Sequence, residues 1–388
     1  MLARDLSDTI LRLAKAFPIV AITGPRQSGK TTLARFVFAD KPYVSLEDPA
    51  ERAFAEEDPR GFLARFGDGA VFDEAQRWPE LFSYLQGLAD ANRGAGRFVL
   101  TGSQQFGLPA GMTQSLAGRV AMTQLLPLSL SELAQGDPDR LDLDNLMLTG
   151  GYPALNTQEL QPQDWFPSYV ATYIERDVRQ VLNVQNLSTF QRFLRLCAAR
   201  SGQLLNFSAL AGEAGVSQGT ARAWLSVLES SYLIHLLPPY HRNFGKRLVK
   251  TPKLYFLDVG LACWLLGIRS ADMLALHPLR GALFETWVVG EFIKARFNAG
   301  QPVDLFFWRD NNRLECDLLF ESEAGLQPIE IKSGRTVTGD YIRAGQRAAR
   351  FASEKTRMPW LIHGGEDCYE RSGVRVIGWR SLAKDMPA

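Results

Sequence analysis

The sequence predicts an α/β protein in which a parallel sheet is followed by a mostly helical middle part and a smaller α/β part. Three observations support this fold class. The apolar run 19–22 enters a glycine-containing loop and then a helix-forming segment. Apolar runs at 43–46, 69–73 and 97–102 alternate with helix-forming segments, a pattern typical of a sheet covered by helices. Three further strand-like runs follow one another between 304 and 333.

Length and charge bound the class of protein. A chain of 388 residues exceeds the about 250 to 300 residues at which single cores stop growing. Changes of pattern suggest domains at residues 1–150, 151–275 and 276–388. Lys and Arg total 43 against 42 for Asp and Glu, a net charge of +1. No global field therefore favours nucleic acid or membrane, and any such surface must be a local patch.

Cysteine usage and the amino-terminal residues favour the cytoplasm. The four cysteines are far apart and include no Cys-x-x-Cys pair, which suggests neither a metal knuckle nor a disulfide framework. Charges stand where a signal peptide needs an apolar segment. No apolar run reaches the about 18 residues of a membrane helix, so we expect no membrane partner.

The loop after the first strand has the spacing Gly-x-x-x-x-Gly-Lys-Thr. Backbone amides of such a loop, together with the amino end of the next helix, bind phosphate groups. We expect the lysine to reach the β and γ phosphates and the threonine hydroxyl to bind Mg²⁺. An ordinary glycine-rich turn leaves Lys-Thr at this place unexplained. The predicted nucleotide-binding residues are Gly24, Pro25, Arg26, Gln27, Ser28, Gly29, Lys30, Thr31 and Thr32.

The strand at 69–73 ends in two acids, Asp73 and Glu74. In phosphate-loop ATPases the first acid of such a pair holds the magnesium shell, and we expect Glu74 to polarise the attacking water. The alternative is that both acids cap the helix starting near Pro79. Glu47 and Asp48, which follow an earlier short strand, either face the nucleotide or cap the next helix.

Two further candidates lie near later strands. The run 97–102 ends at Ser103 and Gln104, and we expect one of them to contact the γ phosphate and the water; a plain turn is the alternative. Arg119 precedes the next strand. Beside the phosphates it would neutralise charge in the transition state, on its own chain or on a neighbour's, whereas a lone arginine at a strand entrance is usually solvated.

The middle part combines predicted helices with a basic segment. One helix is expected over 164–182, and a helix-turn-helix over 205–236 with Ser217 as the cap of its second helix. The basic segment that follows can contact a phosphate backbone. The alternative is that the helices serve only for packing and that the basic segment is a solvated loop. Arg222 is the main base-reading candidate. The basic residues that follow are Arg242, Lys246, Arg247, Lys250 and Lys253.

The three later strands bring another group of charges together. Asp317 and the pair Glu330 and Lys332 lie on consecutive strands, and residues two apart share a face. Two carboxylates and a lysine at one strand end can hold a divalent ion and activate water for phosphodiester cleavage. Surface ion pairs, which contribute little to stability, are the alternative.

These motifs carry a resemblance. The motifs at 24–31, 72–76, 100–104 and 116–119, with Pro-Leu-Ser-Leu-Ser-Glu at 127–132, resemble AAA+ type ATPases. Their order is similar to a prokaryotic family that joins such an ATPase to a C-terminal domain of unknown function. The resemblance implies a five-stranded parallel core, a helical lid and a winged helix. The C-terminal motif resembles the PD-(D/E)xK nuclease superfamily, with Glu285, Asp317, Glu330, Lys332 and also Gln346 at matching positions.

The main hypothesis is a magnesium-dependent ATPase that couples ATP binding and hydrolysis to nucleic-acid binding or remodelling, with DNA favoured, including branched DNA. ATP and Mg²⁺ are the expected cofactors, and the resemblance implies a homo-oligomer. One alternative is a slow ATP-dependent regulatory switch that presents a protein-interaction surface. Another is a metal-dependent nuclease gated by ATP.

Overall fold

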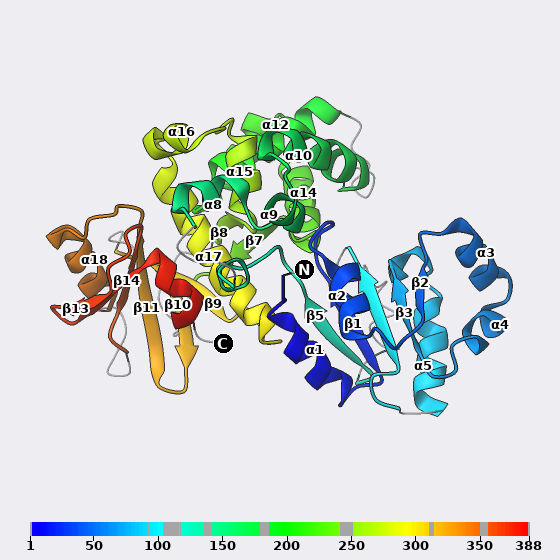
Figure 1. Ribbon diagram of the computed structural model, residues 1–388. Coiled ribbons are helices and arrows are strands. Elements are labelled where there is room, and N and C mark those ends of the chain that lie inside the picture. Colours follow the sequence, from blue (N-terminus) through cyan, green and yellow to red (C-terminus); the bar gives the residue numbers. More distant parts are fainter. Residues whose placement is uncertain are drawn as a thin grey trace.

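The parts of the chain are arranged around three sheets, shown in the computed structural model of Figure 1. The structure describes residues 2–91, 94–103, 116, 118–135, 141–178, 186–240, 251–309, 314–349 and 356–386. The amino-terminal and carboxy-terminal sheets lie on opposite sides of the molecule, with the helices of the middle part between and above them (Figure 1). Within the described ranges, no helix has both the length and the apolar character needed to cross a membrane.

The amino-terminal sheet has five parallel strands in the order β2-β3-β4-β1-β5. Alternate residues of β1 enter different cores, so both faces of the sheet are covered. The predicted five-stranded parallel core is therefore confirmed. The strands are β1 (Ile19–Thr23), β2 (Tyr43–Ser45), β3 (Ala70–Asp73), β4 (Phe98–Gly102) and β5 (Val120–Gln124).

Helices pack on both faces of the amino-terminal sheet and form a hydrophobic core with each face. Helices α1 (Leu6–Ala14) and α2 (Lys30–Val37) pack on one face through apolar residues such as Ile10 and Leu33. Residues such as Phe62 and Leu85 cover the other face. They belong to helices α3 (Pro49–Glu57), α4 (Pro59–Ala64) and α5 (Leu81–Ala91).

The short helices α7 (Leu130–Leu133) and α8 (Leu143–Thr149) follow β5, and α9 (Pro153–Thr157) begins the middle part. The single helix expected over 164–182 is wrong in detail. Helix α10 (Pro162–Tyr169) contains Pro167 and continues as the π-helical segment η3 (Val170–Val178). Proline has no amide to donate, which favours a change of hydrogen-bond pattern at this point.

A second group of elements follows in the order α12 (Leu187–Ala199), β6 (Gln203–Leu204), α13 (Phe207–Ala214), α14 (Gln218–Ser230), β7 (Ile234–Leu237) and β8 (Lys253–Phe256). The three strands form an antiparallel sheet in the order β6-β8-β7. The predicted pair of helices is confirmed. Its cap is Ser217, whose Oγ accepts a hydrogen bond of 3.0 Å from the Thr220 amide.

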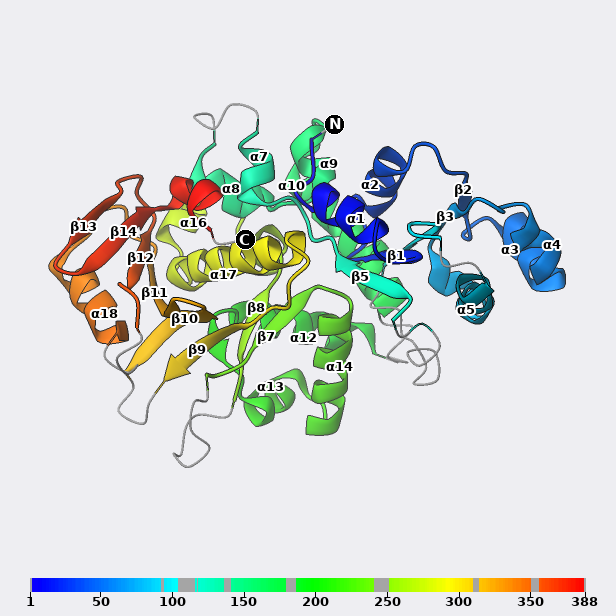
Figure 2. The same ribbon diagram turned by 90° about the horizontal axis from the view of Figure 1, so that it is seen from below.

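Helix α17 (Arg280–Asn298) ties the three parts together. It lies between the C-terminal sheet and α1 (Figure 2). The Asn298 carbonyl accepts a bond of 2.8 Å from the Thr9 hydroxyl of α1. Glu291, buried on the same helix, accepts a bond of 2.6 Å from the amide of Leu130. Helices α15 (Val259–Leu265) and α16 (Ala271–Leu276) precede it.

The C-terminal sheet has six strands in the order β13-β14-β12-β11-β10-β9. Helix α17 packs on one face and α18 (Gly339–Ala349) on the other. The three strands expected between 304 and 333 are confirmed. The strands are β9 (Leu305–Arg309), β10 (Glu315–Ser322), β11 (Gly325–Lys332), β12 (Trp360–His363), β13 (Tyr369–Arg371) and β14 (Val374–Gly378), and the last helix is α19 (Leu382–Asp385).

Candidate functional site

The phosphate loop lies between β1 and α2 and needs its two glycines. Gly24 has φ 150°, and a Cβ there would lie 2.1 Å from the Leu125 carbonyl oxygen. Gly29 has φ 93° and forms the left-handed cap before Lys30. The first turn of a helix leaves amides without intrahelical partners, so this loop presents donors to an anion.

We expect Gly24→Ala to disturb this loop. The added methyl group meets backbone, which has little freedom to move, and the residue has a φ that side chains seldom adopt. Both the unfolding temperature and the affinity for ATP should fall, the latter by about 5- to 150-fold for a cost of about 1 to 3 kcal/mol. Thermal unfolding and equilibrium ATP titration measure these effects.

Gly87→Ala is the matched control, because an added Cβ on α5 meets nothing within 4 Å. Alanine also favours a helix, so this variant should be at least as stable as the unmodified protein. Equal effects of the two substitutions would contradict the role given to the Leu125 contact.

Lys30 is buried and turned into the loop. Its Nζ donates a hydrogen bond of 2.8 Å to the Pro25 carbonyl. Burial lowers the pKa of Lys30 to about 8, against the opposing influence of the Glu74 and Asp73 carboxylates. The Lys30 ammonium group therefore lies within the loop, near the carboxylates of Glu74 and Asp73.

Thr31 and Asp73 are in direct contact. The Thr31 Oγ1 donates to the two carboxylate oxygens at 2.9 and 3.1 Å. The Tyr43 hydroxyl of β2 donates to the same carboxylate at 2.7 Å, and the Thr101 hydroxyl of β4 also donates to it. The hydroxyl and carboxylate oxygens that magnesium prefers are thus adjacent, so the residues fit that ion. Sequence reasoning missed Tyr43 and Thr101, although both lie on strands that neighbour β3.

Glu74 and Ser103 also meet at this edge of the sheet. The Ser103 Oγ donates to Glu74 Oε2 at 3.2 Å, and Gln76 donates to both residues. Glu74 has φ 53° and makes no side-chain cap bond to the short turn at 75–77 that follows it. A left-handed non-glycine residue is uncommon and often occurs at functional sites. Gln104 lies outside the described residues.

A cavity of about 680 Å³ opens in front of the loop. Ligand pockets commonly measure about 300 to 1,000 Å³, so a nucleotide fits this volume. Helix α9 of the middle part forms the opposite wall. Ser28, a loop residue outside this lining, has a buried hydroxyl without a hydrogen-bond partner among the described residues. The lining includes Arg4, Arg26, Gln27, Gly29, Lys30, Thr31, Thr32, Glu47, Glu74, Pro153 and Thr157.

Arg4 supports the loop from behind and was missed by sequence reasoning. Its guanidinium donates to the carbonyls of Ser28 and Leu126, both at 2.7 Å, and pairs with Glu132 at 2.9 Å. Glu132 is fully buried and belongs to the capping box that begins at Ser129. The capping box can be recognised in the sequence because its residues are three apart. The pairing of Arg4 with Glu132 cannot, because 128 residues separate them.

The two acids after β2 have different positions. Asp48 caps α3, accepting a bond of 2.8 Å from the Ala50 amide. Glu47 lines the cavity and lies 4.0 Å from the Arg26 guanidinium and 3.7 Å from that of Arg77. Asp48 therefore has the capping role, and Glu47 lies at the cavity where we expect the nucleotide to bind.

Arg119 lies at the wrong edge of the sheet for its own nucleotide site. It precedes β5, where Val120 pairs with Ile19, whereas the loop follows Thr23 at the other end of β1. At about 3.3 Å per residue, the strand separates them by roughly 16 Å. Arg119 pairs with Asp90 at 2.6 Å. A position beside the phosphates of its own chain is therefore excluded, and action on a neighbouring chain stays a prediction.

Two contacts join the loop to the middle part. The hydroxyls of Thr23, at the end of β1, and Tyr232 are hydrogen-bonded at 2.7 Å. Tyr232 has φ 57° and stands between α14 and β7. The Arg26 guanidinium lies 5.7 Å from the centre of the Tyr173 ring in η3. The nucleotide loop thus touches two segments of the middle part.

The structure describes only some of the residues that were predicted to contact nucleic acid. The Arg222 guanidinium lies 3.9 Å from the centre of the Phe207 ring, so it stacks within the helix pair. Lys253, placed with the basic segment by the sequence, is 3% exposed and does not present its charge on the surface. The other basic residues, Arg242, Lys246, Arg247 and Lys250, lie outside the described residues.

The C-terminal charges converge as expected. Lys332 Nζ lies 2.5 Å from Glu330 and 3.6 Å from Asp317, whose carboxylate also accepts a bond of 2.9 Å from the Ile331 amide. Burial and then Asp317 raise the pKa of Glu330 to about 8, against the influence of Lys332. Gln346 instead donates to the Ser372 carbonyl.

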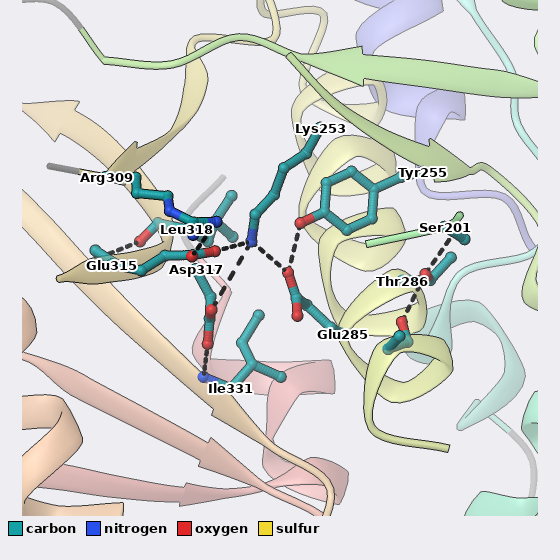
Figure 3. A network of polar contacts seen from close by, with 12 residues as sticks. Ser201, Lys253, Tyr255, Glu285, Thr286, Arg309, Glu315, Asp317, Leu318 and Ile331 are labelled. Carbon is teal, nitrogen blue, oxygen red and sulfur yellow. Dashed lines mark hydrogen bonds and ion pairs between the residues drawn. The ribbon is translucent and has the colours of Figure 1, made fainter. Parts of the chain in front are cut away.

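Lys253 of β8 joins this group, and Figure 3 shows it beside Glu285, Glu315 and Asp317. Its Nζ lies 2.9 Å from Glu285 on α17, 2.6 Å from Glu315 and 3.9 Å from Asp317 on β10. The Tyr255 hydroxyl donates to the same Glu285 oxygen at 2.6 Å. We call Lys253, Glu285, Glu315, Asp317, Glu330 and Lys332 the C-terminal charge cluster.

Three stretches of the chain match models of known protein families. Residues 16–134 match the profile of an AAA domain. Residues 140–272 and 280–382 match two domains of unknown function, DUF8612 and DUF4143. The uncharacterized proteins Rv2008c of Mycobacterium tuberculosis and Mb2031c of Mycobacterium bovis are each 34% identical over 377 residues, covering 96% of this chain and 82% of each relative.

Solved structures show more distant likeness. The Walker-type ATPase PABY2304 of Pyrococcus abyssi is 16% identical, with a TM-score of 0.41 over 67% of this chain and 94% of that one. A single-residue variant of RuvB from Thermotoga maritima is 18% identical, with a TM-score of 0.30 over 60% of this chain and 87% of that one.

Proposed function

Since the chain belongs to the family of AAA-domain proteins that includes Rv2008c and Mb2031c, we propose that it is a magnesium-dependent ATPase. The observation that carries this proposal is the contact between Thr31 and Asp73 at 2.9 Å. It stands beside a buried Lys30 and at the mouth of a nucleotide-sized cavity. A glycine-rich turn without nucleotide chemistry would not require these groups together.

The residues divide the work of phosphoryl transfer. Loop amides and Lys30 would bind the β and γ phosphates, and Thr31 with Asp73 would hold Mg²⁺, which neutralises phosphate charge when bound. Glu74 would orient the attacking water, and Ser103, hydrogen-bonded to it at 3.2 Å, would report the γ phosphate. Positioning and electrostatic stabilisation account for most of the catalysis in this class of reaction.

We further propose that the nucleotide state reaches the middle part through the hydrogen bond between Thr23 and Tyr232. Thr23 immediately precedes Gly24, so a loop that closes on a triphosphate acts directly on this bond. Contact between Arg26 and Tyr173 provides a second connection to η3. A ligand shifts a conformational equilibrium only through such differential contacts.

The proposed output is nucleic-acid binding or remodelling, with DNA favoured. The order α12, β6, α13, α14, β7, β8 resembles that of a winged helix, and this resemblance supports the proposal. Two observations favour a second candidate, a slow regulatory switch with a protein-interaction surface. Arg222 is stacked on Phe207, and Lys253 is buried. In either case AAA domains commonly assemble, and Arg119 would act on a neighbouring chain in a homo-oligomer.

The test is ATP turnover with and without linear, forked and four-way DNA. We expect several-fold stimulation by at least one of these DNAs, and the stimulation should fall steeply as salt increases, because phosphate neutralisation releases counterions. Turnover that no DNA alters, at any salt concentration, would favour the regulatory switch.

Tyr232→Phe serves as the coupling variant in the same assay. It removes one hydroxyl from a contact outside the phosphate-binding residues, so turnover without DNA should stay within about twofold while stimulation is lost. Tyr84→Phe, on the surface of α5, is the matched control and should behave as the unmodified protein.

A further inference from the structure

We propose that the carboxylates of the C-terminal charge cluster form the binding site of the Lys253 ammonium group and not of a divalent cation. The C-terminal sheet is then a clamp that holds β8 of the middle part. Cleavage of phosphodiester bonds is not its function. The proposal rests on the position of one side chain and on the groups around it (Figure 3).

Lys253 occupies the place of a divalent ion that would bind both Glu285 and Glu315. Its Nζ lies within hydrogen-bond distance of carboxylates from two elements, Glu285 of α17 and Glu315 of β10. A divalent ion binds such oxygens at about 2.0 to 2.6 Å and would overlap with the ammonium group. Across the described part of the chain, no three acidic, histidine or cysteine side chains are grouped so as to hold a metal ion.

The local backbone directs these groups toward Lys253. Strand β10 has a shift of register between Cys316 and Leu319, and such bulges turn side chains away from the regular alternation. Asp317 lies within this bulge. One of its oxygens accepts the Ile331 amide, and the other lies 3.9 Å from Lys253.

Charges in the cluster are nearly balanced by protein groups. The four carboxylates of Glu285, Glu315, Asp317 and Glu330 face three cations, Lys253, Lys332 and Arg309. Burial alone would lower the pKa of Lys253, but the carboxylates of the cluster raise it well above its usual value. The ammonium therefore stays charged at neutral pH, and little negative charge is left to attract a second cation.

The clamp joins two parts of the chain. Lys253 and Tyr255 both belong to β8, and both contact Glu285 on α17. Next to them the hydroxyls of Ser201 and Thr286 are hydrogen-bonded at 2.8 Å, and Ser201 also accepts the Phe256 amide. A buried lysine that loses its partners leaves uncompensated charge, so the pair resists separation.

The first experiment is a double-mutant cycle on the full chain, read by thermal unfolding. Lys253→Met leaves carboxylates without their cation, and Glu285→Gln removes one of the two carboxylates within hydrogen-bond distance of the ammonium group. Each substitution should therefore lower the unfolding temperature by several degrees. The double variant should lose less than the sum of the two shifts. Lys384→Met, at an exposed position of α19, is the control and should leave the temperature unchanged. Additive shifts would overturn the clamp.

A second measurement needs no change at Lys253 and decides the matter if that variant does not fold. Mn²⁺ binding is measured in an Asp73→Asn background, which disables the proposed metal site of the ATPase, with and without Asp317→Asn. We expect no Mn²⁺ binding that depends on Asp317, and no cleavage of linear or four-way DNA in Mn²⁺ or Mg²⁺. Binding or cleavage that is lost with Asp317→Asn would overturn the proposal.

Discussion

Replacing Glu74 by glutamine is expected to lower the rate of ATP hydrolysis by about two to four orders of magnitude, the usual contribution of a positioned acid or base. Glutamine keeps the size of the side chain and an acceptor for the Ser103 hydroxyl. It loses the negative charge that would orient and polarise the attacking water. ATP should still bind, because the phosphate contacts come from the loop and from Lys30.

Single-turnover phosphate release and equilibrium binding of ATP measure the two effects separately. Glu80→Gln is the matched control, since Glu80 is exposed six residues further along and its loss should change neither quantity. Undiminished hydrolysis would remove Glu74 from its role. Loss of ATP binding together with hydrolysis would instead indicate that the Glu74 side chain maintains the loop through its contacts with Ser103 and Gln76.

Lys30→Ala is expected to abolish measurable hydrolysis, with a loss of at least about 100-fold, because a preorganised positive donor to the phosphates is removed. The affinity for ATP should also fall. Lys15→Ala is the control, since Lys15 is an exposed lysine at the end of α1. Unchanged phosphate release in Lys30→Ala would place the active site elsewhere.

The same lysine gives ATP binding a pH dependence. The pKa of Lys30 in the free protein is lowered to about 8, so the cation is present below pH 8 and is lost as the pH rises above it. Binding a polyanion above that pH requires proton uptake, and the affinity should fall by up to about tenfold per pH unit. This dependence should be absent in Lys30→Ala. If the ATP affinity of both proteins changed equally with pH, titration of Lys30 would not be the cause.

The parts of the fold with local signals were predictable. The spacing from Gly24 to Thr31 and the acids after an apolar strand define the phosphate loop and the neighbouring strand from sequence alone. The parallel sheet follows, because short buried strands alternate with helices. The structure then brings Lys30, Thr31, Asp73, Glu74 and Ser103 to one edge of that sheet.

Pairings across long stretches of chain had no such signal. Arg4 meets Glu132, and Lys253 meets Glu315, through contacts that depend on how separate parts pack. Lys253 was therefore grouped with the basic surface segment, although its partners Glu285 and Glu315 lie on α17 and β10. The sequence left open whether Arg119 acts on its own chain or on a neighbour's, and the strand pairing excludes its own chain. In a parallel sheet a residue before one strand lies at the edge opposite to a loop that follows its neighbour.

The three-stranded sheet of the middle part has a mechanical consequence. Tyr232, at one end, is bonded to Thr23, whereas Lys253, at the other, is held among the C-terminal carboxylates. Leu237 pairs with Lys253, so the two attachment points are separated by roughly 17 Å of extended backbone. Hydrogen-bonded strands stretch very little. A displacement of Thr23 at the end of β1 would therefore be passed on by this sheet to Lys253 and would change the orientation of the C-terminal sheet.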